Sequence, residues 1–315
     1  KPEKRKIIAR ERSYHGVTVA AASLTGLPVT QNHFDLPVDA LGILRTDHPH
    51  YYRGKLEGET EIQFVDRIVG NLENLIIAED PSTIAAFIAE PITGASGVIV
   101  PPDGYYEGIQ NVLDKYGIMF WADEVITGFG RTGNDFGCTT MEIKSPDMMT
   151  FAKQLSSAYM PISASAIRRD VYEAMIDQSA SAGAFGHGYT YSGHPVACAV
   201  ALRVLEIYDR DEIFDRASTT GKYLQEQLSQ FSSHPLVGEV RGSGLLAALE
   251  LVPNKELNHQ FKDGKVGGVA QKMAQDNGLL IRTVAGSSIG ICPPLIITNN
   301  QIDELIDKLG DALDK

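Results

Sequence analysis

Glu90, Asp123 and Lys153 each follow an apolar run of the chain, close to the point where the run gives way to a loop. Charged groups are rarely placed at the end of a buried strand without a partner or a task. Two carboxylates and one amine at one edge of a sheet could form a structural ion pair. They could equally supply a base and its charged partner for catalysis. The residue types alone leave both interpretations open.

The runs before these residues alternate with helical patterns over much of the chain before Pro195. We predict strands at Lys6–Arg10, Ile84–Ala89, Ile118–Ala122, Met148–Phe151 and Ile162–Ile167, with helices at Glu59–Leu75, Tyr105–Tyr116 and Val171–Ile176. Such alternation is typical of an α/β fold with a mainly parallel central sheet between layers of helices. Ligands of these sheets bind at the carboxyl ends of the strands, so this edge deserves the closest inspection.

The pattern changes after Pro195. We predict helices at Val196–Tyr208, Glu212–Leu228, Val266–Asp276 and Ile302–Leu313, and short strands at Val237–Val240, Leu245–Leu251, Leu279–Arg282 and Ile289–Cys292. Apolar residues recur at helical spacing in the long stretches. We therefore expect a large domain over residues 1–208 and a smaller α+β domain over residues 209–315.

The run Gly128–Gly133 matches the dinucleotide-binding pattern GxGxxG and follows a predicted strand. That pattern functions when a helix begins there, so that its free N–H groups meet a pyrophosphate. Residues 134–140 have no helical periodicity, and Lys153 stands about twenty residues on, where an acidic ribose ligand belongs. We therefore reject a nicotinamide site.

The run Gly286–Gly290 matches GxSxG, the nucleophile pattern of one class of hydrolases. Such hydrolases need an acidic residue and then a histidine further along the chain. No histidine follows His259 in the sequence. We therefore interpret the run as a turn before a strand.

The charge balance argues against two classes of partner. Among 315 residues, 28 are Lys or Arg and 40 are Asp or Glu, which gives a formal charge of −12. Negative charge opposes binding to nucleic-acid phosphates and anionic membrane surfaces. No run of about 18 apolar residues is present to span a bilayer. We expect neither nucleic acid nor a membrane as a partner.

Cysteines and histidines give no metal-binding pattern. Cys138, Cys198 and Cys292 are too widely spaced for a zinc cage, and their odd number forms no closed disulfide set. This pattern favours a reducing compartment, and we expect the cytoplasm. The pair His48 and His50 lacks an acidic or cysteine partner at ligand spacing, so we predict a solvated loop there and no metal site.

Five motifs are spread along the chain between residues 13 and 295. They are Ser13-Tyr14-His15-Gly16, Ala89-Glu90-Pro91, residues 122–133 together with Thr150-Phe151-Ala152-Lys153, residues 187–195, and Cys292-Pro293-Pro294-Leu295. In this order they resemble the class III aminotransferases, enzymes that depend on pyridoxal 5′-phosphate. The resemblance covers essentially the whole chain. It implies the fold type I architecture, with a large cofactor-binding domain and a smaller C-terminal domain.

The resemblance assigns catalytic roles to Lys153 and Asp123. Lys153 would form the Schiff base with the cofactor aldehyde, and its freed amine would move a proton between the substrate Cα and the cofactor. A lysine acts in this way only if its pKa is lowered. Asp123 would lie against the pyridine nitrogen and keep it protonated, so that the ring accepts electrons.

Other cofactor contacts follow from the same resemblance. Tyr14 and Val125 would pack on opposite faces of the pyridine ring. His15 is either a ring contact or a hydrogen-bonded structural histidine. Glu90 would orient Asp123 or the neighbouring backbone.

Residues 187–195 imply a second copy of the chain. In the family, a threonine at the position of Thr190 reaches the cofactor phosphate of the partner subunit. A homodimer with shared active sites is therefore expected. Tyr189, next to it, is an expected substrate contact.

Departures from the family pattern indicate the substrate class. The ornithine and GABA branch has a glutamate at the position of Ala95 and an arginine at that of Gly290, and Ile126 replaces the usual glutamine. These absences favour the branch that transfers amines or ω-amino acids to pyruvate. In that branch a mobile arginine meets the substrate carboxylate, and Arg282 occupies its place, with a surface arginine as the alternative interpretation.

Further departures surround the lysine. Gln154, Ala158 and Met160 stand where relatives usually have Gly, Gly and Ala, which puts the breadth of substrates in question. The phosphate loop of the family lies upstream of Lys1, and a chain without it would bind the cofactor weakly.

The sequence thus predicts a transaminase that moves an amino group from a primary amine or ω-amino acid to pyruvate or another 2-oxo acid. Two alternatives remain open. One is a different cofactor-dependent reaction on the same scaffold, such as decarboxylation, mutase or racemase chemistry. The other is a non-catalytic fragment.

Overall fold

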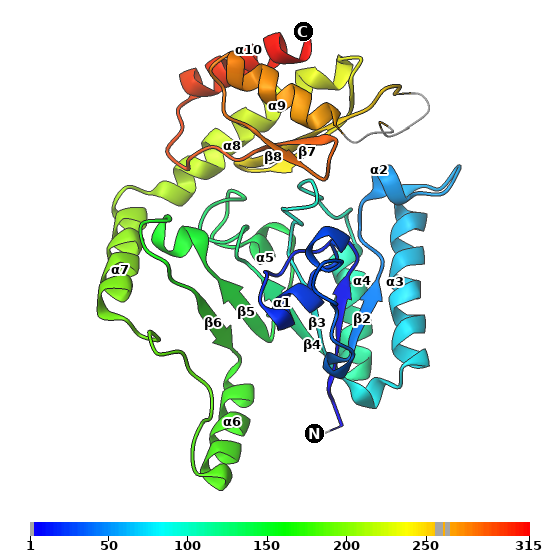
Figure 1. Cartoon of the computed structure of the whole chain (residues 1–315), viewed down its shortest axis with the longest axis vertical. Helices are drawn as coiled ribbons and strands as arrows, with labels where there is room; N and C mark the ends of the chain where they lie inside the picture. The colour runs from blue at the N-terminus through cyan, green and yellow to red at the C-terminus, as the bar shows by residue number, and fades with distance from the viewer. Residues whose placement is uncertain (1–2, 256–260, 262–264) are drawn as a thin grey trace.

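The apolar runs form the central strands of a six-stranded sheet. The computed structural model describes residues 3–255, 261 and 265–315. The sheet has the order β2-β1-β3-β4-β5-β6 and is parallel except at β6, which pairs antiparallel with β5 (Figure 1). Its strands are β1 (Lys6–Arg10), β2 (Ile43–Thr46), β3 (Ile84–Ala89), β4 (Met119–Asp123), β5 (Met148–Phe151) and β6 (Ala164–Ile167). The predicted α/β class with a mainly parallel sheet is confirmed.

Helices cover both faces of this sheet. The helices of this part of the chain are α1 (Val19–Leu24), α2 (Tyr51–Gly54), α3 (Glu61–Ala78), α4 (Tyr105–Tyr116), α5 (Gly137–Thr140) and α6 (Arg169–Ala182). On one face, buried side chains of α3 and α4 such as Phe64 and Ile109 pack on Ile8 and Phe87 of the sheet. On the other face, Leu24 packs on Ala9 and Ile88. Burial of these apolar surfaces is the main force that holds the layers together.

The sequence analysis missed β2. This strand has four residues, and only Ile43 and Leu44 are apolar. It lies at the edge of the sheet, where one neighbour instead of two fixes it. Its Arg45 donates hydrogen bonds to the carbonyl oxygens of residues 23–25 at the end of α1. A short edge strand in which half of the residues are polar has too few consecutive apolar residues to be predicted from the sequence.

The second sheet is antiparallel and has the order β7-β8-β10-β9. Its strands are β7 (Val237–Ser243), β8 (Leu246–Leu251), β9 (Arg282–Val284) and β10 (Ser288–Ile291), and its helices are α8 (Ile213–Ser229), α9 (Val266–Asp276) and α10 (Asn299–Leu313). Helix α7 (Pro195–Arg210) leads from the first sheet towards them (Figure 1). The prediction of a strand at Leu279–Arg282 is wrong, because pairing begins only at Arg282, opposite Gly290. The division of the chain at Asp209 stays a prediction.

A buried ionic network joins the second sheet to the first half of the chain. The Arg241 guanidinium lies 2.8 Å from the Glu250 carboxylate and donates to the Gly97 carbonyl at 2.7 Å. The other Glu250 oxygen lies 2.8 Å from Arg53. Each charge has an opposite charge or a hydrogen-bonding partner, which a buried ion requires. The network therefore fixes the second sheet against the loop that contains Gly97.

The predicted solvated loop at His48–His50 is wrong. The His50 ring is buried, and its Nε2 lies 2.9 Å from Glu239 on β7. The sequence showed no acidic partner because Glu239 is 189 residues away along the chain. Burial lowers the pKa of His50, and burial also lowers that of His48, to about 3.

Because of this ionic network, we expect the stability of the fold to fall at acidic pH. Burial alone would raise the pKa of Glu250, but Arg241, the Ser288 hydroxyl and Arg53 outweigh it and hold the pKa at about 2. A depressed carboxyl pKa stabilises the fold above the unfolded-state pKa, and this stability is lost as the pH falls towards 2. We expect Glu250→Gln to lower the free energy of unfolding by about 3–5 kcal/mol at pH 7, because it removes the negative charge that lies between the two buried guanidinium groups of Arg53 and Arg241.

Urea unfolding at pH 7 and at pH 3 measures this effect. The difference between wild type and Glu250→Gln should shrink at pH 3, where the wild-type carboxylate is losing its advantage. Glu304→Gln is the control, because Glu304 pairs with Lys308 on an exposed face of α10 and should change stability little. An equal loss from both variants would contradict the role of the network.

Candidate active site

The sheet brings Glu90, Asp123 and Lys153 to one edge. Strands β3, β4 and β5 are adjacent and parallel, and Ala89 pairs with Ala122 while Asp123 pairs with Thr150. The three residues therefore follow neighbouring strands on the same side, as the sequence predicts. Glu90 and Asp123 both act electrostatically on Lys153 and oppose the lowering of its pKa. The three side chains thus form one cluster.

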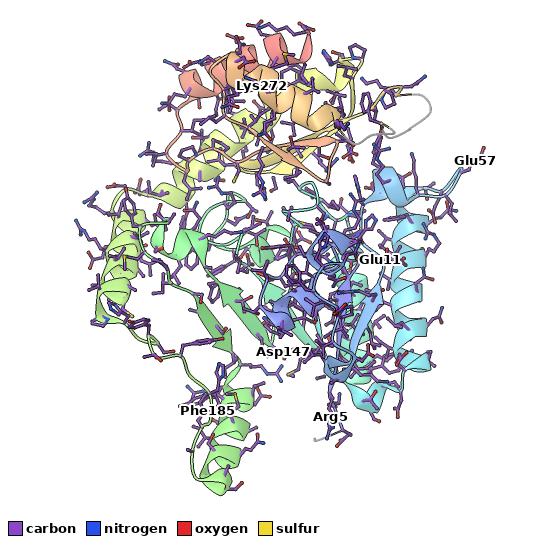
Figure 2. All side chains as sticks on the ribbon, in the orientation of Figure 1. Arg5, Glu11, Glu57, Asp147, Phe185 and Lys272 are labelled. Atoms are coloured by element: carbon purple, nitrogen blue, oxygen red, sulfur yellow. The ribbon has the colours of Figure 1, made fainter. Side chains whose placement is uncertain are left out.

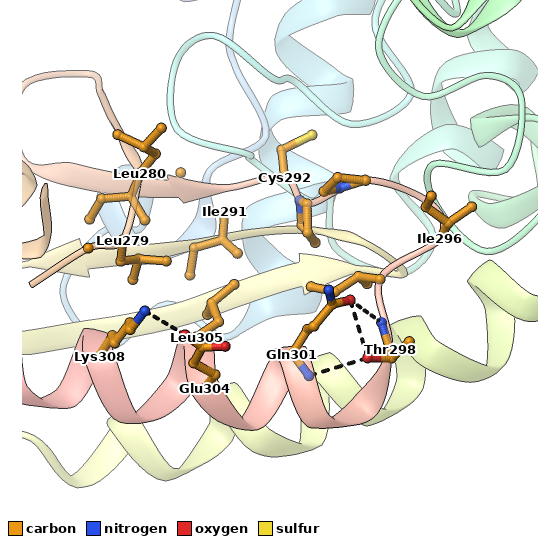
Figure 3. A pocket seen from close by; sticks show the side chains of 16 residues that line it. Leu279, Leu280, Ile291, Cys292, Ile296, Thr298, Gln301, Glu304, Leu305 and Lys308 are labelled. Carbon is orange, nitrogen blue, oxygen red and sulfur yellow. Dashed lines mark hydrogen bonds and ion pairs between the residues drawn. The ribbon is translucent and has the colours of Figure 1, made fainter.

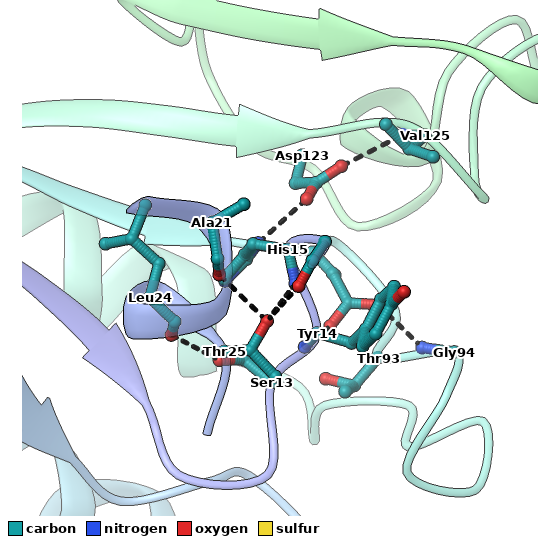
Figure 4. Close-up of polar contacts among 12 residues, drawn as sticks. Ser13, Tyr14, His15, Ala21, Leu24, Thr25, Thr93, Gly94, Asp123 and Val125 are labelled. Atoms are coloured by element: carbon teal, nitrogen blue, oxygen red, sulfur yellow. Dashed lines mark hydrogen bonds and ion pairs between the residues drawn. The ribbon is translucent and has the colours of Figure 1, made fainter. Parts of the chain in front are cut away.

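Asp123 is held by His15 and by the backbone. The His15 Nδ1 lies 2.7 Å from Asp123 Oδ2, and the Val125 N–H donates to Asp123 Oδ1 at 3.1 Å (Figure 4). Both the His15 and the Asp123 side chains are buried. The arrangement orients the carboxylate from both oxygens. His15 Nε2 is also buried and has no hydrogen-bond partner among the described residues, so the far side of the ring can contact a ligand.

Glu90 organises the segment that carries Tyr14. Its Oε1 accepts the Tyr14 N–H at 2.9 Å, and its Oε2 accepts the Gly94 N–H at 2.9 Å. Burial raises the pKa of Glu90, and the nearby Asp123 adds to the rise, while His15 opposes it. Among the described residues, the hydrogen bonds of the Glu90 carboxylate thus go to the backbone of Tyr14 and Gly94 and not to the Asp123 side chain.

The sequence analysis missed Arg10, which binds the segment that follows β3 at the same edge of the sheet. Its guanidinium is buried and donates to the Glu90 carbonyl at 2.6 Å and to the Thr93 hydroxyl at 3.1 Å. Arg10 is the last residue of β1, so it obeys the rule that selected Glu90 and Asp123: an ionisable group at the end of an apolar strand. Applying that rule to every predicted strand would have found it.

Lys153 has an uncommon backbone conformation. Its φ is +43°, in the left-handed region that residues with a Cβ avoid. The side chain is exposed to solvent in the single chain, yet it is surrounded closely enough that desolvation lowers its pKa. A lowered pKa increases the fraction of neutral, nucleophilic amine at neutral pH. Strain of this kind persists where the surrounding structure enforces it, and it is frequent at functional sites.

A cavity of about 780 Å³ opens beside Lys153. Tyr14, Ile126, Arg282, Gly290 and Cys292 are among its lining residues. Ala95 lines it too, so the positions that depart from the GABA-branch pattern all face the same space. A neighbouring groove between the second sheet and α10 shares Gly290, Ile291 and Cys292 with the cavity (Figure 3). Arg131 and Arg282 also line it, beside Lys153.

Thr190 and Tyr189 lie apart from this cluster. Both belong to an exposed segment between α6 and α7, and Tyr189 is 77 % exposed. Neither residue lines the cavity. The structure of one chain therefore brings together Tyr14, His15, Glu90, Asp123, Val125, Lys153 and Arg282, but not these two residues.

The glycine-rich run after Asp123 packs against the second half of the chain. Gly130 has φ +86°, and a Cβ there would lie 2.6 Å from the Phe214 ring. Between these glycines, Arg131 is buried and donates to the carbonyl oxygens of Leu245 and Pro293 at 3.1 and 2.6 Å. No helix begins before Gly137 in this run. The run is therefore a close-packing surface, which agrees with our rejection of a dinucleotide site.

The run Gly286–Gly290 starts in a turn over residues 285–287 and continues into β10, which begins at Ser288. Ser287 and Ser288 are buried, and the Ser288 hydroxyl donates to Glu250 at 2.6 Å. This serine is thus committed to the ionic network. The interpretation of the run as a turn before a strand is confirmed.

Comparison with known proteins identifies the family. A model of the class-III aminotransferases matches residues 1–313. The chain is 50 % identical over 314 residues to a probable γ-aminobutyrate transaminase 3, mitochondrial, of Oryza sativa subsp. indica, and covers 99 % of itself and 61 % of that protein. It is also 50 % identical to the γ-aminobutyrate transaminase 1, mitochondrial, of Solanum lycopersicum, at 99 % and 60 % coverage.

Solved structures of transaminases have the same fold as this chain. A transaminase with L-alanine superposes with a TM-score of 0.97 at 48 % identity, covering 99 % of this chain and 73 % of that one. The ω-transaminase of Pseudomonas jessenii in complex with PMP superposes with a TM-score of 0.96 at 48 % identity, with coverage of 99 % and 68 %. The chain belongs to the class-III aminotransferase family. It spans about three fifths of the length of the curated relatives that it matches.

Class-III aminotransferases use pyridoxal 5′-phosphate, and the site fits its ring. A buried carboxylate oriented by His15 suits a protonated pyridine nitrogen. The unpartnered His15 Nε2 leaves a polar contact open, and Lys153 would offer an amine of lowered pKa to the aldehyde. The residues present therefore fit the cofactor ring.

Proposed function

We propose that this protein transfers an amino group from a primary amine or ω-amino acid to pyruvate or another 2-oxo acid. The observation that carries the proposal is Lys153, strained and of lowered pKa, at the same sheet edge as the His15–Asp123 pair. The relatives named as γ-aminobutyrate transaminases support γ-aminobutyrate as one such ω-amino acid. The structures named as transaminases support the reaction class.

When bound, the cofactor supplies a cationic ring that accepts the electrons released at the substrate Cα. Asp123 would hold the proton on the ring nitrogen, and His15 would keep the carboxylate in place. The Lys153 Nζ would take the proton from the substrate Cα and give it to the carbon that carries the aldehyde in the free cofactor, which needs a neutral amine. Tyr14 and Val125 would pack on the two faces of the ring, and Glu90 fixes the backbone that carries Tyr14.

The cavity wall sets the substrate class. Ala95 and Gly290 leave room where the GABA branch has an ion pair, and Ile126 adds an apolar surface. Arg282 would bind a substrate carboxylate. An arginine that is free to move away avoids an unpaired buried charge when an amine without a carboxylate is bound.

Arg282→Ala should therefore impair the half-reaction with pyruvate more than the half-reaction with an amine that lacks a carboxylate. A charged hydrogen bond contributes about 1.5–3 kcal/mol, so we expect KM for pyruvate to rise about 10- to 100-fold, with a smaller effect on a carboxylate-free amine. Single-turnover rates of each half-reaction measure this. Arg203→Ala, which removes a surface arginine of α7, is the matched control. Equal losses in both halves would exclude this role for Arg282.

The reaction class has a direct test. The cofactor-loaded protein is mixed with an amine alone, without a 2-oxo acid. Transamination predicts one equivalent of carbonyl product per site and then a stop, because no acceptor remains. Continuous turnover, or release of CO₂, would favour the decarboxylase, mutase or racemase alternative.

The alternative of a non-catalytic fragment needs a separate experiment. Borohydride reduction followed by mass spectrometry would find the cofactor mass on the peptide that contains Lys153. Absence of label from a folded, cofactor-supplemented preparation would leave only the fragment alternative. The two experiments together distinguish a wrong reaction from an incomplete site.

We also propose a homodimer in which Thr190 contacts the cofactor phosphate of the partner subunit. The segment 183–194 and the helix α6 bury no side chain in the single chain, and Tyr172, Phe185 and Tyr191 are exposed there. Figure 2 shows Phe185 beside α6, which projects from the main body. Light scattering would measure the oligomeric state, and a monomer at active concentrations would overturn the proposal.

The cytoplasm remains the proposed location. Cys138, Cys198 and Cys292 are all free thiols, which suits a reducing compartment. Among the described residues, no helix is both long enough and apolar enough to cross a bilayer.

A further inference from the structure

Tyr208, near the end of α7, contacts the segment that carries the reactive lysine. Its hydroxyl donates to the Gln154 carbonyl at 2.9 Å and lies 3.1 Å from Gln154 Oε1. Gln154 follows Lys153 directly in the chain, so the phenol supports the backbone next to the reactive residue.

The supported segment is strained. Lys153, Ser157 and Ala158 have φ values of +43°, +47° and +63°, all left-handed. Each such residue costs on the order of 1–3 kcal/mol, so the surroundings must enforce the conformation. The segment is partly closed on itself, since the Ala158 N–H donates to the Lys153 carbonyl at 3.3 Å and the Ser156 hydroxyl donates to the Met160 carbonyl at 2.6 Å.

Support from outside the segment is sparse. In the part of the chain that the structure describes, the recorded hydrogen bonds that reach residues 152–160 from elsewhere all come from Tyr208. Helix α7 packs against residues 153–156 and Ser156 is buried, but hollows adjoin the segment on either side. Lys153 and Gln154 line the large cavity, and Gln154, Ser157 and Tyr159 line a second hollow of about 370 Å³. A strained segment between two hollows depends strongly on its remaining contacts.

Tyr208 is itself well anchored. It is 7 % exposed, belongs to the apolar core of the second half of the chain, and packs its ring against Phe214 at 5.4 Å between centroids. Burial raises the pKa of Tyr208, so the phenol stays a donor at neutral and mildly alkaline pH. A fixed donor of this kind can transmit the rigidity of a packed core to a loop.

We propose that Tyr208 is a positioning residue, which holds the left-handed backbone at Lys153 through Gln154 and so keeps the lysine side chain directed to the large cavity. The role of the amine rests on the proposed function, but the positioning does not. In relatives with glycine at the position of Gln154, the side-chain half of this contact would be absent.

One phenol proton cannot serve two acceptors at full strength. An amide turned by 180° places Nε2 where Oε1 lies, and can then donate to the phenol oxygen. The phenol is thereby free to donate to the Gln154 carbonyl. Tyr208→Phe removes both interactions, whereas Gln154→Ala removes only the side-chain interaction, so the second variant should have the smaller effect.

Two measurements without cofactor test the proposal. In Tyr208→Phe we expect hydrogen exchange of the amides in 153–160 to become about 5- to 10-fold faster, the factor for one lost net hydrogen bond. We also expect the pH midpoint of Lys153 acetylation, followed by mass spectrometry, to rise towards the ordinary lysine value of 10.5, because a looser segment no longer holds the amine against the surrounding residues that partly desolvate it.

Tyr223→Phe is the matched control, since it removes a phenol that donates to Asp303 on the surface, away from the segment. Exchange and acetylation at 153–160 should not change in this variant. Unchanged behaviour of a folded Tyr208→Phe, or an equal change in both variants, would overturn the proposal. Failure of amine transfer in the wild type would refute the proposed function and leave these two measurements interpretable.

Discussion

Replacement of Asp123 by asparagine should lower kcat/KM for amine transfer by about 10³-fold, the upper range for loss of one preorganised electrostatic contact. Asparagine keeps the shape of the side chain and can still meet His15, but it has no charge to hold a proton on a pyridine nitrogen. The ring then accepts electrons poorly, so proton removal from the substrate Cα becomes slow. Single-turnover kinetics with an amine substrate measures this step directly.

The position of the carboxylate makes the prediction specific. Asp123 is buried, and both of its oxygens are engaged by neighbours in this chain. Asp303→Asn is the control, because Asp303 lies on the exposed face of α10 and should leave the rate unchanged. A rate for Asp123→Asn within a few-fold of wild type, with the cofactor bound, would show that Asp123 is a structural ion-pair partner of His15 and not a ring contact.

Replacement of Lys153 by alanine should have the largest effect of all, a loss of at least about 10⁴-fold, since a positioned general base alone contributes 10²–10⁴. The variant also loses the covalent attachment point, so borohydride should no longer label the peptide of residues 149–160. Small tertiary amines, which cannot act as amino donors, should restore part of the rate, and the more basic ones should restore more, because they supply a free base in place of the lysine amine.

The control for this variant is Lys115→Ala, which removes a surface lysine paired with Glu73. It should keep full activity and full labelling at Lys153. Retention of amine transfer by Lys153→Ala at more than about a hundredth of the wild-type rate, without added amine, would contradict the assignment.

Much of the central sheet follows from local sequence. β1, β3 and β5 occur at the predicted residues, because each contains a short apolar run bounded by polar residues and lies between two neighbouring strands. The helix α4 also occurs as predicted, since its apolar residues recur at helical spacing and Gly117 ends it in a left-handed conformation. The strand at Leu279–Arg282 is wrong because an apolar run does not show which residues find a pairing neighbour.

Part of the candidate site could also be predicted from the local sequence, and part could not. The rule that ionisable residues at strand ends meet at one edge needs only the order of residues and the parallel sheet, and it placed Glu90, Asp123 and Lys153 together. His15 stayed ambiguous because its partner, Asp123, is 108 residues away along the chain. Contacts over that distance depend on how the layers pack, which no local pattern encodes.

The sequence by itself determined the residue types at the ends of β3, β4 and β5, and with them the class of chemistry. Only the tertiary structure decided that Glu239 would bury His50, that Arg241 and Glu250 would join the second sheet to the first half of the chain, and that Tyr208 would reach the backbone beside Lys153. The physical reason is that strand and helix formation depend on neighbours within a few residues. The burial and pairing of polar groups depend on which distant surfaces come into contact.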